Sequence, residues 1–140
     1  MIYLLRSHTT QERSSWAHST TRLPSSPGLA AASAGPCPHD LRVNATVDEI
    51  TQNGGRGIAL PADVAVEANA EAAVAAAVSD FGGLHVLVSN AIYDLPLAPV
   101  TEISYDDWRR TMDVNLNSAF LFSKHAIPAI DTCGGGSIIL

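Results

Sequence analysis

The feature that most constrains the fold of this chain is a short, mostly apolar run at residues 84–88, which is followed directly by Ser89 and Asn90. Two glycines at 82–83 close the run on its other side. A Val/Leu-rich run of this length, bounded by turn residues, is typical of a strand buried on both faces in a parallel sheet. Such sheets bind ligands at the carboxyl ends of their strands, so Asn90 is a candidate site residue.

Helical and strand patterns alternate over residues 41–140. Strands that alternate with helices of this length imply right-handed crossovers and a parallel sheet. The predicted class is therefore α/β, with a partial Rossmann-like, doubly wound domain at 41–140. The predicted elements are helices at 43–52, at 67–81 and from Ser104 to about Pro128, and strands at 57–61, 84–91 and 137–140.

Residues 1–40 differ in composition from the rest of the chain. They are rich in Ser, Thr and Pro, contain a single acidic residue before Asp40, and show no apolar period. Prolines and clustered hydroxyl side chains oppose regular helices, so the sequence predicts a mostly disordered leader at 1–40. Two alternatives stay open, namely an organellar transit peptide and the loss or replacement of the true amino terminus of the domain.

Composition argues against several classes of function. The formal net charge of -6 disfavours nucleic acid and anionic membranes as partners, because both require clustered Lys and Arg. No stretch approaches the roughly 20 apolar residues that span a bilayer. Cys37 and Cys133 lie far apart and outside any cluster with metal-ligand spacing, so neither a metal site nor a disulfide framework is predicted. The expected location is the cytoplasm.

Several short motifs stand in an order that resembles the short-chain dehydrogenase/reductase family. Residues 89–92 resemble its NNAG motif and keep two of the four positions. The resemblance implies a Rossmann fold, NAD or NADP as cofactor, and hydride transfer to or from a small alcohol or ketone. The motifs are Ala62-Asp63-Val64, Phe81-Gly82-Gly83-Leu84, Ser89-Asn90-Ala91, Trp108, Asp113-Val114-Asn115-Leu116 and Gly135-Gly136-Ser137-Ile138.

The same resemblance implies roles for five residues. Asp63 would accept a hydrogen bond from the adenine amino group, and the backbone of Val64 would lie against the adenine ring. Asn90 would brace the central strands, Ala91 would let the ribose approach the backbone, and Asn115 would be the catalytic Asn of the helix. Two simpler interpretations stay open: Asp63 as a helix cap or turn acid, and Asn115 as a bond to a neighbouring loop.

Parts of the family pattern are missing from the sequence, which resembles a family member truncated at both ends. No TGxxxGxG turn precedes residue 54, and Phe120 stands where a Tyr-x-x-x-Lys pair would need its tyrosine before Lys124. Ile92 also replaces the usual glycine. We therefore expect weak cofactor binding and no reductase activity from this chain alone. In the family strand order 3-2-1-4-5, the strands at 57–61 and 84–91 would be the third and fourth, separated by two missing ones.

Three hypotheses follow from different classes of protein. The first is an NAD(P)-dependent oxidoreductase of this family, present as a fragment. The second is an inactive remnant that acts as a protein-interaction module through the helix at 104–128, which in the family commonly forms a homo-oligomer interface. The third is an unrelated α/β binding domain.

Overall fold

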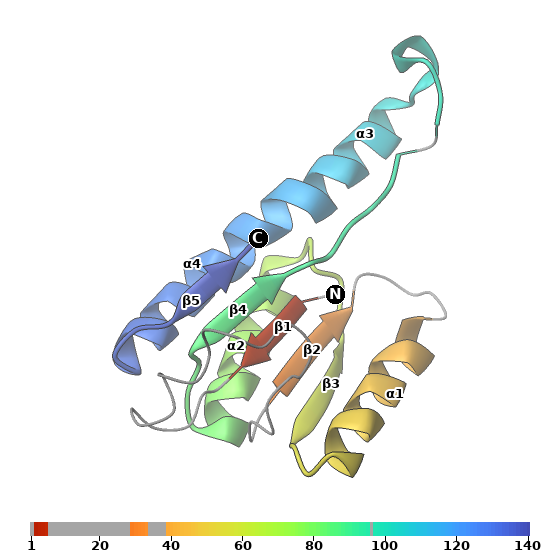
Figure 1. The fold of residues 1–140 in the computed structure, drawn as a ribbon. Helices are drawn as coiled ribbons and strands as arrows, with labels where there is room; N and C mark the ends of the chain where they lie inside the picture. Colours follow the sequence, from red (N-terminus) through yellow and green to blue (C-terminus); the bar gives the residue numbers. More distant parts are fainter. Residues whose placement is uncertain (1, 6–28, 34–38, 96) are drawn as a thin grey trace, which may run out of the picture.

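The computed structural model describes residues 2–5, 29–33, 39–95 and 97–140, and strands and helices alternate along most of them (Figure 1). The predicted α/β class is confirmed. The elements are β1 (Ile2–Leu5), β2 (Leu29–Ser33), α1 (His39–Gln52), β3 (Gly57–Pro61), α2 (Glu67–Phe81), β4 (Val86–Ser89), a 3-10 turn (Val100–Glu102), α3 (Tyr105–Met112), a π-helical turn (Asp113–Asn117), α4 (Ser118–Thr132) and β5 (Ser137–Ile139).

The sheet has five strands in the order β3-β2-β1-β4-β5. β2 runs parallel to β3, and β4 runs parallel to β5. β1 runs antiparallel to both of its neighbours, so that Ile2 pairs with Ala32 on one side and with Ser89 on the other. Because two reversals cancel, β2, β3, β4 and β5 all point the same way, and their carboxyl ends share one edge of the sheet.

The centre of the sheet is a correction to the expectation from sequence. β3 and β4 are separated by two strands, as predicted, but β1 and β2 occupy the positions expected to be missing. Two segments of the range predicted as a mostly disordered leader are thus strands, and residues 1, 6–28 and 34–38 of that range lie outside the described residues.

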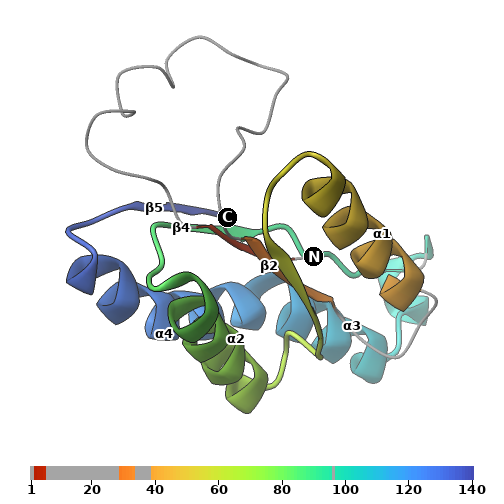
Figure 2. The ribbon, with the colours of Figure 1, turned by 90° about the horizontal axis from the view of Figure 1, so that it is seen from below.

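Helices cover both faces of the sheet. α1 lies on one face, whereas α2, α3 and α4 lie on the other (Figure 2). The core fills the space between the sheet and the layer formed by α2 and α4. Its buried members are Val64, Ala70, Ala73, Val74, Ala77, Phe81, Leu84, Leu87, Val114, Phe122, Ala126 and Ile130.

α2 shows how the local sequence sets an element that later positions the site. Its bounds are those predicted, because small and apolar side chains repeat at helical spacing and Gly82 ends it in the left-handed region at φ 78°. The N–H of Gly82 donates to the carbonyl of Val78 at 2.8 Å. Val78, in the last turn of the helix, is 41% exposed.

α3, the π-helical turn and α4 form one long rod (Figure 1). Ser104 caps its start, as predicted, by accepting a hydrogen bond from the N–H of Asp107 at 3.0 Å. The rod was expected to end near Pro128, but it continues to Thr132. Ile130, which is 6% exposed, packs into the core and holds this last turn against the cost of the proline.

Candidate functional site

Asp63 lies in the turn between β3 and α2, where hydrogen bonds to several other residues hold it. Its Oδ1 accepts from the N–H of Ala65 at 3.0 Å, which is an Asx turn, and its Oδ2 accepts from Nη1 of Arg110 at 3.0 Å. The carbonyl of Asp63 accepts from the side-chain amide of Asn69 at 3.0 Å. The interpretation of Asp63 as a turn acid is therefore correct locally, and its carboxylate also has a distant partner.

The charge of Asp63 is stabilised in the folded chain. Partial burial acts to raise the pKa of this carboxyl, but the hydrogen bond from Ala65 and the hydrogen bond and positive charge of Arg110 outweigh it, so the pKa lies below its usual value. The Asp63 side chain keeps 33% of its surface exposed. It is an ionised acceptor that a ligand can still reach.

Val64, the next residue, anchors this turn to the core. Its side chain is completely buried, at 0% exposure. Burial of a Val side chain stabilises the fold by about 1.5–3 kcal/mol, which is enough to fix the backbone on either side of it. The backbone beside Asp63 is therefore anchored to the core.

The carboxyl end of β4 carries Asn90 and Ala91. Ala91 is partly buried and packs against the core. Asn90 is exposed, and no side-chain hydrogen bond of Asn90 to another described residue is present, so a bracing role for its amide stays a prediction. Ile92, which replaces the usual glycine, is 70% exposed and points away from the core.

Asn115 holds the loop that leaves β4. Its Oδ1 accepts from the backbone N–H of Tyr93 at 2.7 Å, and its Nδ2 donates to the carbonyl of the same residue at 3.0 Å. Asn115 lies in the π-helical turn Asp113–Asn117, an extra-wide turn of the kind often found at functional sites. Asn115 is exposed, whereas its neighbours Val114 and Ser118 are buried.

The α3 and π-helical segment connects the two halves of the site. Arg110 reaches the turn after β3, and Asn115 reaches the loop after β4. Both contacts lie at the edge where the carboxyl ends of the parallel strands gather, which is where open α/β sheets bind ligands (Figure 1). The sequence identified Asp63 and Asn115 but missed Arg110, because a single arginine in a charged helix turn gives no pattern that points to a partner.

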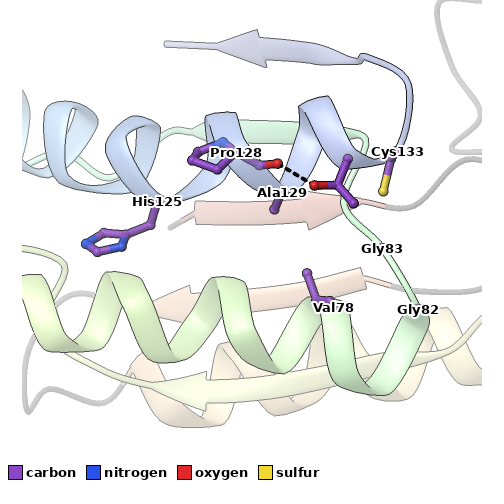
Figure 3. Close-up of a pocket in the computed structure, with 8 residues that line it drawn as sticks. Val78, Gly82, Gly83, His125, Pro128, Ala129 and Cys133 are labelled. Carbon is purple, nitrogen blue, oxygen red and sulfur yellow. Dashed lines mark hydrogen bonds between the residues drawn. The ribbon is translucent and has the colours of Figure 1, made fainter.

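A groove of about 360 Å³ lies elsewhere, between α2 and α4. Figure 3 shows His125, Ala129 and Cys133 of the α4 side facing Val78 and the two glycines that end α2. Gly82, Gly83 and Cys133 precede the amino ends of β4 and β5, at the edge opposite to Asp63 and Asn90. The groove is therefore separate from the candidate site.

Neither a membrane-spanning helix nor a metal-binding cluster is present among the described residues. None of their helices is long and apolar enough to cross a membrane. No group of three or more His, Cys, Asp or Glu side chains among these residues is arranged to hold a metal ion.

Comparison with known proteins identifies the family. Residues 30–140 match the sequence model of a family described as enoyl-(acyl carrier protein) reductase, and the fold superposes on a short-chain dehydrogenase/reductase of Serratia marcescens, a double mutant, with a TM-score of 0.64 and 36% identity over 71% of this chain and 39% of that one. The chain belongs to the short-chain dehydrogenase/reductase family. The resemblance inferred from the motifs is thereby confirmed.

Two further members of the family are similar to this chain. A cyclohexanol dehydrogenase of Acinetobacter sp. (strain SE19) is 42% identical over 93 residues, which are 66% of this chain and 37% of that protein. A 3-ketoacyl-ACP reductase of Sinorhizobium meliloti 1021 has a TM-score of 0.69 and 34% identity, covering 78% of this chain and 42% of that one. The chain thus spans about two fifths of the length of these family members.

Within the family pattern, the described residues fit one end of the cofactor better than the other. Asp63 offers an ionised, reachable acceptor beside a fixed stretch of backbone, which suits the amino group and ring of an adenine. The family's glycine-rich turn would follow the first strand at the same edge. Here β1 ends at Leu5, which pairs with the first residues of β2 and β4 and so lies at the opposite edge.

Proposed function

We propose that this chain functions in NAD(P)-dependent oxidoreduction, in which a hydride is transferred between the nicotinamide cofactor and a small alcohol or ketone. Its membership of the family supports the reaction class, and its similarity to a cyclohexanol dehydrogenase and a 3-ketoacyl-ACP reductase supports the substrate class. The observation that carries the proposal for this chain is the ionised Asp63 carboxylate at the carboxyl edge of the sheet.

In this proposal the residues divide into two sets. Asp63 and Val64 receive the adenine, and Asn90 and Ala91 lie along the path of the adjoining ribose. The cofactor, when bound, supplies or accepts the hydride. Asn115 belongs to the catalytic set, and here its side chain fixes the loop at Tyr93 beside the carboxyl end of β4.

We do not expect the 140-residue chain to catalyse this reaction by itself. Its only lysine, Lys124, is preceded four positions earlier by Phe120, so the sequence contains no tyrosine and lysine pair of the kind that exchanges the proton. We expect no oxidation of cyclohexanol with NAD⁺ or NADP⁺ by this chain. A saturable rate with either cofactor would contradict that expectation.

Binding is the direct test of the proposal. We expect NAD⁺ and NADP⁺, added to the isotope-labelled chain, to shift the amide NMR signals of residues 63–65 and 90–93, whereas nicotinamide mononucleotide, which lacks the adenosine, leaves 63–65 unchanged. Asp63→Ala should abolish the shifts, and Asp80→Ala, an exposed acid at the other end of α2, should not. Identical shifts in wild type and Asp63→Ala would refute the proposed adenine site.

We also propose that the chain self-associates through the helix at 104–128. The support is a set of large apolar side chains that this rod leaves exposed: Trp108 at 49%, Leu116 at 57%, Phe120 at 65% and Ile127 at 48%. A contiguous exposed apolar patch is typical of an interaction surface, and we propose that these side chains form one along the rod. Phe120→Glu should convert the associated form to monomer in sedimentation experiments, whereas Leu97→Glu, outside the rod, should not. A wild-type chain that stays monomeric at high concentration would refute this second proposal.

The proposed location is the cytoplasm. It is supported by the low cysteine content of the sequence, two residues without a framework of disulfide spacing. Fluorescent tagging of the chain in its host cell tests it, and signal confined to an organelle would contradict it.

A further inference from the structure

We propose that Arg110 is a positioning residue that fixes the Asp63 carboxylate for recognition of an adenine amino group. The proposal rests on the adenine site proposed above and adds a residue that no motif of the sequence marks. Arg110 and Asp63 are 47 residues apart in sequence and come from α3 and from the turn before α2. Their contact is therefore a feature of the fold and not of local structure.

Geometry shows what the contact does to the carboxylate. The N–H of Ala65 donates to Oδ1 and the guanidinium of Arg110 donates to Oδ2, each at 3.0 Å, so both oxygens have a donor that orients the carboxylate. Each oxygen of a carboxylate accepts more than one hydrogen bond, so both keep capacity for a further donor. Fixing an acceptor before the ligand arrives removes the entropic cost of orienting it.

Accessibility is consistent with a role in binding. The Arg110 side chain is 35% exposed and the Asp63 side chain is 33% exposed. About two thirds of each side chain is covered by the protein, which restrains the ion pair, and the exposed remainder lets a ligand reach the Asp63 carboxylate. Arg109, the adjacent residue, differs in this respect, because its side chain is 61% exposed and lies 4.0 Å from Asp106 in the same helix.

The position of Arg110 also couples the two halves of the site. Arg110 and Asn115 lie on the same continuous rod, one before and one within the π-helical turn. One fixes the turn after β3 and the other fixes the loop after β4. A shift of this rod would move both the adenine acceptor and the β4 loop together.

Discrimination between adenine and hypoxanthine is the decisive measurement. Adenosine monophosphate carries an amino group at the position where inosine monophosphate carries a carbonyl, which a carboxylate repels. We expect wild type to prefer adenosine monophosphate by about tenfold in NMR titrations, the ratio that a charge-assisted hydrogen bond supports. In Arg110→Met the preference should fall to about twofold, and in Arg110→Lys, which keeps the positive charge, most of it should return.

Arg109→Met is the matched control, because it removes the same charge from the same helix. It should keep the wild-type preference. If Arg110→Met retains the full preference, or if Arg109→Met loses it equally, the positioning role of Arg110 is refuted while the adenine site stands. If wild type binds neither nucleotide, or binds both alike, the adenine site and the positioning role fall together.

A second measurement needs no ligand. Removal of the Arg110 guanidinium takes away a hydrogen bond and a positive charge that oppose the effect of burial, so the pKa of Asp63 should rise in Arg110→Met and stay unchanged in Arg109→Met. Carboxyl carbon NMR titration measures it, with Asp63→Asn for assignment. If Arg110→Met fails to fold, as judged by circular dichroism, Arg110→Gln replaces it in both measurements. An unchanged Asp63 titration in the folded variant overturns the proposal.

Discussion

Gly136→Ala should destabilise the chain more than its small size suggests. A Cβ at residue 136 would lie 1.9 Å from the carbonyl oxygen of His85 and 2.7 Å from its carbonyl carbon, whereas ordinary contact begins at 3.4 Å. Both atoms belong to the backbone and cannot rotate away. β5 would have to move by about 1.5 Å relative to the chain that enters β4, which is more than a hydrogen bond tolerates.

The expected magnitude follows from the bonds that this movement breaks. The N–H of Ser137 donates to the carbonyl of His85 at 2.8 Å, and β5 then pairs with Val86, Leu87 and Val88. Loss of two to four of these hydrogen bonds, at about 1 kcal/mol each, gives a loss of about 2–4 kcal/mol in the free energy of unfolding.

Gly134→Ala separates the clash from the effect of a glycine's backbone freedom. At Gly134 an added Cβ meets nothing within 4 Å, but φ is +83°, so the cost there should be about 1 kcal/mol of backbone strain. Urea denaturation followed by circular dichroism compares the two variants, and amide exchange at Ser137 detects local release of β5. If Gly136→Ala costs no more than Gly134→Ala and leaves Ser137 protected, the reasoning from the clash is refuted.

Three further predictions concern packing, charge and the Asn115 contact. Phe122→Ala should lower the free energy of unfolding by about 3–5 kcal/mol, because its side chain is 0% exposed, whereas Phe120→Ala in the same helix, 65% exposed, should change it by less than about 0.5 kcal/mol in urea denaturation of the monomer. The hydrogen bond from Lys124 and the neighbouring His125 hold the pKa of Glu67 below its usual 4.5. The stability that the Glu67 carboxylate adds is therefore present above about pH 4.5 and is lost as the pH falls through the lower pKa of the folded chain. Glu67→Gln should remove this acid-dependent loss, and parallel curves of stability against pH for the two proteins would contradict the prediction. Asn115→Ala should cost about 1–2 kcal/mol and speed amide exchange at Tyr93, whereas Asn117→Ala, whose amide donates to Asp113 in the same turn, should leave that exchange unchanged.

The elements that sequence predicted correctly are those with local causes. α2 has the predicted bounds because its apolar period and the left-handed Gly82 act within a few residues of each other. β3 likewise follows a glycine turn and has its predicted bounds. The start of α3 was predicted from Ser104, whose capping bond spans three residues.

The strands in the centre of the sheet could not be predicted in the same way. β1 has four residues and β2 has five, and although both are largely apolar, runs this short do not by themselves distinguish a strand from a helix or a loop. Their stability comes from pairing with β4 and β3, which lie far along the chain. Strand formation depends on such partners more than on the strand's own residues, so the sequence within 1–40 predicted a leader and not a sheet centre.

In the candidate site, too, the features with local causes were predicted and those that depend on distant parts of the chain were not. Asp63, Val64 and Asn115 were identified because each stands in a motif, but the exposure of Asn115 and the reach of Arg110 depend on how the long rod crosses the ends of β3 and β4. The π-helical turn rotates the residues after it relative to those before it, so the ordinary helical period does not predict which residues are buried on both sides of Asn115. The face that is buried runs through Val114, Ser118 and Phe122 instead.

The direction of β1 affects which ligands can bind at the edge of the sheet formed by the carboxyl ends of β3 and β4. A phosphate cradle of the family type needs a first strand that ends beside Asp63 and Asn90, because the backbone amides that face the phosphates come from the turn that follows it. β1 begins at that edge and ends at the other, with Leu5 opposite Val86. An adenine, which needs an acceptor and a flat wall, makes no use of that turn, whereas a pyrophosphate does. We therefore expect the described residues to bind the adenine end of the cofactor without a matching contribution from the pyrophosphate. Adenosine monophosphate and the intact dinucleotide should then bind this chain with similar affinity.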